Sequence, residues 1–141
     1  AWAADPEHLR APAVADRAVD AVAARARNAI VSGDDRTATT LLQAARRYAD
    51  KAGRADSDAM RRLRAAVAEA VETRITDAAG NVDRTNALAA LAVAEHLGLD
   101  APTTTRLTRQ ARAIPDLAAL AVVGIGVVAL APRLGIELPW Q

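Results

Sequence analysis

Residues 36–51 read RTATTLLQAARRYADK, and this stretch shows the pattern that decides the fold. Apolar side chains recur along it at the spacing of one face of an α-helix. The stripe consists of Ala38, Leu41, Leu42, Ala45, Tyr48 and Ala49, and it continues to Ala52. The opposite face carries arginines, a glutamine, an aspartate and a lysine. One apolar stripe and one charged face are typical of a helix that lies on a hydrophobic core.

Glycine, proline and aspartate divide the rest of the chain into further helical segments. We expect helices over residues 12–31, 57–79, 84–97 and 103–114. Pro12 is predicted to start the first of them as a first-turn proline. In the third helix the expected apolar stripe is Met60, Leu63, Val67, Ala70, Val71, Ile75 and Ala78. Residues 87–94, ALAALAVA, are apolar on every side, which predicts a helix surrounded by its neighbours.

The composition favours an all-α fold. Hydrophobic residues make up 52% of the 141 residues, but aromatic residues only 2%, with no phenylalanine. A core without phenylalanine must be built from alanine, leucine, valine and isoleucine, and alanine is the best helix former. We therefore predict an all-α helical bundle of five to six helices with a strongly apolar C-terminal helix. Residues 1–114 are expected to form an amphipathic helical domain, and residues 115–141 the apolar C-terminal helix and tail.

The sequence contains no motif that carries recognisable chemistry. There is no cysteine, and neither His8 nor His96 stands in a metal-ligand spacing. The aspartate pairs Asp34-Asp35 and Asp56-x-Asp58 are explained most simply as helix caps. Either Asp34 or Asp35 can cap the second helix, and either Asp56 or Ser57 can open the third. We therefore expect a protein that is not an enzyme, with no catalytic residue, cofactor, metal or small-molecule substrate. The first residues have no basic or long apolar stretch, so no signal peptide is expected.

Residues 117–131, LAALAVVGIGVVALA, contain no charged or polar side chain, and we call them the apolar segment. One hypothesis is a transmembrane anchor with the helical domain on the cytoplasmic side, since arginines precede the segment and Trp140 follows it. A helix of fifteen residues is about 22 Å long, short of the roughly 30 Å hydrocarbon core. An anchor would therefore have to borrow residues on both sides.

Two other hypotheses bury the apolar segment in protein. It can be a central helix that the other five surround, or it can pack against another copy or a different protein, because so large an apolar patch is not tolerated in water. Gly124 and Gly126 favour close packing, which offsets their cost in a helix. The candidate contact residues for a partner or a membrane are Leu117, Leu120, Val123, Gly124, Val127, Val128 and Leu130.

Two groups of arginines are weaker candidates for contacting nucleic acid. They are Arg61, Arg62 and Arg64 in the third helix and Arg106, Arg109 and Arg112 in the fifth. Either group could form a phosphate-contacting face. Aspartates lie among the first group, and 18 basic against 17 acidic residues give a net charge of only +1. A solvated or salt-bridged face is the simpler interpretation.

The sequence thus predicts a non-enzymatic subunit for protein–protein interaction or assembly, which uses its apolar C-terminal helix for packing. A protein partner or a homo-oligomer is the expected binding partner. The first alternative is a membrane-tethered helical domain with a C-terminal anchor, and the second is a nucleic-acid-binding regulator. The expected location is the cytoplasm, or a membrane with the helical domain on its cytoplasmic side.

Overall fold

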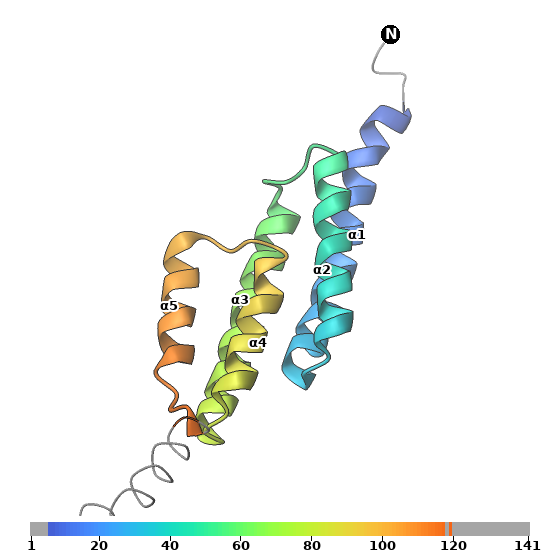
Figure 1. Cartoon of the computed structure of the whole chain (residues 1–141). Coiled ribbons are helices and arrows are strands. Elements are labelled where there is room, and N and C mark those ends of the chain that lie inside the picture. Colours follow the sequence, from blue (N-terminus) through green and yellow to red (C-terminus); the bar gives the residue numbers. More distant parts are fainter. Residues whose placement is uncertain (1–5, 118, 120–141) are drawn as a thin grey trace, which may run out of the picture.

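The structure is a computed structural model that describes residues 6–117 and 119. Within this range it consists of α-helices without any strand, as Figure 1 shows. The helices are α1 (Pro6–Ser32), α2 (Asp35–Lys51), α3 (Asp58–Gly80), α4 (Arg84–Glu95) and α5 (Ala101–Arg112). The prediction of an all-α bundle is therefore confirmed. Of the predicted C-terminal helix, residues 118 and 120–141 lie outside the described part of the chain.

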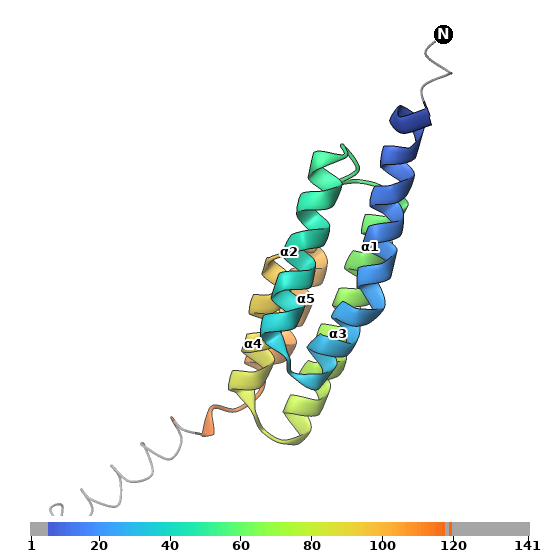
Figure 2. The same ribbon diagram turned by 90° about the vertical axis from the view of Figure 1, so that its right-hand side faces the viewer.

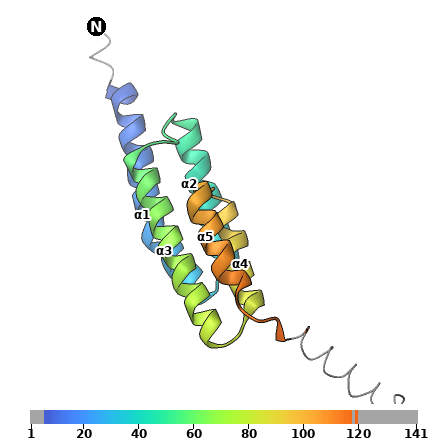
Figure 3. The same ribbon diagram turned by 90° about the vertical axis from the view of Figure 1, so that its left-hand side faces the viewer.

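Consecutive helices run in opposite directions along a common axis (Figures 1 and 2). The first four form a closed ring of contacts, in which α1 packs on α2 and α3, and α4 packs on the same two helices. Short connections favour this up-and-down arrangement. The fifth helix, α5, packs against α3 and α4 (Figure 3). It therefore adds a helix to one side of a four-helix bundle.

Alanine dominates the interior of the bundle. Among the described residues, 13 of the 25 buried apolar side chains are alanines, and the largest fully buried ones include Ile30, Leu42, Met60, Leu63 and Leu107. Short alanine side chains let helix backbones approach closely, and the leucine, methionine and isoleucine side chains fill the space that remains. The predicted stripe of the third helix is buried in full.

Side-chain caps fix where four of the helices begin. The backbone N–H of Thr37 donates to Asp34, that of Met60 to Ser57, and that of Asn86 to Asp83. Asp100 caps α5 in the same way. Each cap accepts a hydrogen bond from an N–H group that has no partner inside its helix. Of the alternatives left open by the sequence, Asp34 and Ser57 are the residues that cap.

Two predicted helix starts are wrong. The first helix begins at Pro6, so Pro12 lies inside it. Pro6 meets the preference for proline in a first turn, and most of the residues that follow are good helix formers, so the helix extends at the cost of one missing N–H at Pro12. The fifth helix begins at Ala101 instead of residue 103, because Asp100 is its cap and Pro102 is accommodated in its first turn.

Two predicted burials are also wrong. Tyr48 is exposed, because it lies at the edge of the α2 stripe and the centre of that stripe is occupied by alanines and Leu42. The helix α4 is not surrounded by its neighbours: Leu88 is 39% exposed, and Ala92 is exposed as well. Three helices contact α4, and they leave one of its faces open. This open face shapes the surface described below.

Candidate functional site

The chain leaves the bundle just after α5. Ile114 is buried in the core, and Pro115 and Asp116 follow it on the surface. The Asp116 carboxylate accepts a hydrogen bond from the backbone N–H of Ala119 at 3.3 Å, which is the geometry of a helix cap. Leu117, the first residue of the apolar segment, is 55% exposed. A new helical turn therefore starts at the surface of the bundle with an apolar residue.

Only the first of the predicted contact residues can be placed. Leu117 lies at the surface as stated above, and Leu120, Val123, Gly124, Val127, Val128 and Leu130 lie outside the described residues. The described core is made by α1 to α5 together with their connections, and Ile114 is its last residue. Within the described residues, the interior of the bundle is thus filled by side chains that precede the apolar segment.

An apolar groove lies between α4 and α5, on the open face of α4. It has a volume of about 230 Å³. Four leucines line it, namely Leu88 and Leu91 of α4, Leu99 of the connection and Leu107 of α5. Polar side chains border it, among them Glu95 and Arg112. We call this surface, as defined by these lining residues, the α4–α5 groove.

The order of residues in α4 explains why leucines line the groove. The inner face of the helix is formed by Ala87, Ala90 and Ala94 together with Val93. Leucines at positions 88 and 91, three residues apart, share the outer face. The open side of α4 thus carries the exposed Leu88 and the partly buried Leu91, whereas the inner face consists mostly of alanine. A helix whose outer face contacts only solvent normally carries polar residues there instead of leucines.

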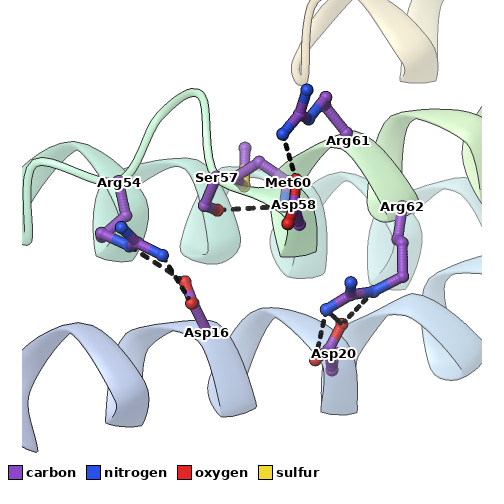
Figure 4. A network of polar contacts seen from close by, with 8 residues as sticks. All are labelled: Asp16, Asp20, Arg54, Ser57, Asp58, Met60, Arg61 and Arg62. Atoms are coloured by element: carbon purple, nitrogen blue, oxygen red, sulfur yellow. Dashed lines mark hydrogen bonds and ion pairs between the residues drawn. The ribbon is translucent and has the colours of Figure 1, made fainter.

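Figure 4 shows the ion pairs around the start of α3, in which two of the first group of arginines take part. Arg62 donates to both carboxylate oxygens of Asp20, at 3.0 and 3.1 Å, and Arg61 pairs with Asp58. A neighbouring pair joins Arg54 to Asp16 at 2.8 Å. The hydrogen bond from Arg54 lowers the pKa of the Asp16 carboxyl below its usual value.

The other arginines are divided between internal partners and the surface. Arg64 donates to the backbone carbonyl of Ala55 at 3.0 Å, and Arg106 pairs with Glu72 at 2.9 Å. The hydrogen bond from Arg106 lowers the pKa of the Glu72 carboxyl. In the part of the chain that the structure describes, neither Arg109 nor Arg112 makes an ion pair. Four of the six arginines named as nucleic-acid candidates therefore bind acceptors of this chain, and the hypothesis itself stays a prediction.

A buried arginine, Arg74, is not among the residues predicted from the sequence. The side chain of Arg74 in α3 is 5% exposed, and it bonds to three other helices or their ends. It donates to Asn86 Oδ1 from Nε and Nη2 at 2.9 and 2.7 Å, and to the carbonyl of Ile30 at 3.3 Å. It also pairs with Asp35 through both terminal nitrogens. A signal existed, because Arg74 follows Val71 by three residues and Val67 by seven, and so shares their buried face.

Of the two histidines, His96 has a structural partner. His96 is the residue at the C-terminal end of α4, and its Nδ1 lies 3.2 Å from Gln43 Nε2. Across residues 6–117 and 119, no group of three or more acidic or histidine side chains could hold a metal ion. No helix in the same range is long and apolar enough to cross a membrane. The chain matches no protein-family model, no curated protein and no solved structure.

Proposed function

We propose that this chain is a non-enzymatic helical assembly protein, in which the five-helix bundle carries an apolar packing segment at its C-terminal side. The observation that carries the proposal is the exit of the chain after Ile114. The described core ends there, and Asp116 caps a helical turn whose Leu117 is 55% exposed. Fourteen further residues without a polar side chain follow in the sequence.

Physical chemistry requires such a segment to be covered. Burying apolar surface contributes about 25 cal/mol per Å², and monomeric proteins rarely leave large contiguous apolar patches in water. Eight of the fifteen residues are leucine, isoleucine or valine. A second protein surface can cover them without the chain having to span a membrane, for which fifteen helical residues are short. Subunit assembly is therefore the function that these features support best.

The experiment measures the mass of the full-length protein by analytical ultracentrifugation. In the test variant, Val123→Asp and Val127→Asp place two charges on the apolar segment. A matched control carries the same two changes at exposed valines of α1, as Val14→Asp and Val31→Asp. We expect wild type and control to be oligomers and the test variant to be a folded monomer, with an unchanged far-UV circular dichroism spectrum.

A vesicle arm separates assembly from the membrane alternative. Full-length protein is mixed with vesicles that contain phosphatidylserine and is then spun through a density gradient. Assembly predicts that the wild-type oligomer stays with the soluble fractions. A wild-type monomer that floats with the vesicles, and loses this binding in the test variant, would contradict the assembly proposal.

A further inference from the structure

We propose that the α4–α5 groove is the receptor for the apolar segment of a second copy of this chain. This inference rests on the proposed assembly function and names the surface that receives the segment. It joins two described features, the leucine-lined groove and the exit of the chain at Leu117.

The chemistry of the groove suits an apolar helix, and the helices that form its walls are similar in length to the segment. The groove is lined by four leucines and bordered by polar side chains, which is the usual arrangement of a groove that receives an apolar helix. Its two walls, α4 and α5, have 12 residues each and are therefore about 18 Å long. The apolar segment has fifteen residues, so as a helix it would be about 22 Å long. One helix from another molecule can thus cover the groove along its whole length.

The exit of the chain favours a second copy over the chain's own segment. If the segment folded back onto its own groove, its first turn would be the part nearest to the groove. Leu117 and Ala119 are both exposed, and neither lines the groove. Only Pro115 and the capping Asp116 separate this turn from the buried Ile114. The described start of the turn therefore lies outside the molecule's own groove, which favours a neighbour as the occupant.

Each copy contributes one groove and one segment, so exchange between two copies can satisfy both. If the two copies are related by a two-fold axis, each segment occupies the other groove and the assembly closes as a dimer. The exchange removes from water the exposed apolar surface of the groove, mainly that of Leu88, and the segment that the sequence leaves without polar residues.

The test uses full-length variants that change either the groove or the apolar segment, but not both. Leu88→Glu puts a charge into the groove at a side chain that is 39% exposed, so the bundle can still fold. Its matched control is Val31→Glu, at a similarly exposed apolar residue of α1 outside the groove. The segment variant is again Val123→Asp with Val127→Asp. Circular dichroism and thermal unfolding check that each variant is folded.

We expect Leu88→Glu to raise the dimer dissociation constant about 30-fold or more, because a desolvated carboxylate would face the apolar segment. Val31→Glu should change the constant less than threefold. Mixing the Leu88→Glu variant with the segment variant should give a one-to-one heterodimer, since one intact segment and one intact groove remain. Neither variant should form dimers alone at the same concentration.

The outcomes separate this inference from the proposed function. If the wild type assembles and the segment variant does not, but Leu88→Glu assembles like the wild type, assembly stands and the groove is not the receptor. If the wild type is a monomer, both proposals fail. A monomer in which Leu88→Glu newly exposes the segment would show that the segment occupies its own groove, which also overturns the exchange between copies.

Discussion

Arg74 brings a positive charge into the interior of an alanine-rich bundle. Its partners place it toward the end that holds the α1–α2 and α3–α4 connections (Figure 1). Its partners are the Ile30 carbonyl near the end of α1, Asp35 in the first turn of α2 and Asn86 in the first turn of α4. A cation near the carbonyl end of a helix interacts favourably with the helix dipole. The Arg74 side chain of α3 thus bonds to α1, α2 and α4 at one end of the bundle.

Replacing Arg74 by leucine should lower the free energy of unfolding by about 3 kcal/mol, because Asp35 and Asn86 lose their partner. The value lies at the lower end of the range for buried ion pairs, since the Asp35 side chain is 38% exposed and water can reach it. Urea unfolding followed by far-UV circular dichroism measures the change. The control is Arg62→Leu, which removes an exposed pair with Asp20 and should cost less than about 1 kcal/mol. Equal losses in the two variants would show that the buried Arg74 network stabilises the fold no more than the exposed Arg62–Asp20 pair does.

At the scale of the helices, the caps decide where each element begins. Sequence patterns located the breaks between helices correctly, because glycine and a following capping residue are local signals. They could not decide between neighbouring residues such as Asp56 and Ser57. That choice depends on which side chain the packing of α3 turns toward the first free N–H groups.

Removing the Ser57 hydroxyl should therefore destabilise the bundle, whereas removing the neighbouring carboxylate should not. Ser57→Ala is expected to lower the free energy of unfolding by about 1 kcal/mol, because the N–H of Met60 then loses its acceptor. Asp56→Ala should stay within about 0.5 kcal/mol of wild type, since Asp56 is exposed. Chemical denaturation of both variants under the same conditions provides the comparison. A larger loss in Asp56→Ala than in Ser57→Ala would show that Asp56, and not Ser57, caps α3.

The sequence was least informative where two elements meet. Residues 87–94 are apolar all round, so their periodicity could not show which side of α4 is left open. The open side arises from the position of α5 on α3 and α4, which is a tertiary property. The partners of Arg62 and Arg74 were equally hidden, because each lies on a helix far away in the sequence. Of the candidate site, the sequence predicted the apolar segment but not the groove.

At the scale of the whole molecule, α5 is the described helix that buries the fewest residues. It buries Leu107 and Ala111, whereas nine residues of α3 are buried. Elements with few buried apolar contacts open locally more often than the rest of a fold.

We therefore expect the backbone amides of α5 to exchange hydrogen faster than those at the centre of α3. Hydrogen–deuterium exchange with mass spectrometry measures both in one experiment. Because α5 forms one wall of the groove, its protection should rise when the protein concentration is raised and the segment of a second copy binds. In the Leu88→Glu variant that rise should be absent. Equal exchange in α5 and α3 at low concentration would contradict the expectation that α5 opens first.

The near-absence of aromatic side chains determines the near-UV absorption and the fluorescence of this protein. Tyr48 lies on the surface, and no phenylalanine exists to absorb from the interior. The two tryptophans stand at positions 2 and 140, so fluorescence emission originates close to the two ends of the chain. Trp140 follows the apolar segment by nine residues. The emission wavelength and anisotropy of Trp140 would register a change around the C-terminal region without a label, in addition to the emission of Trp2, because residues 6–117 contain no tryptophan.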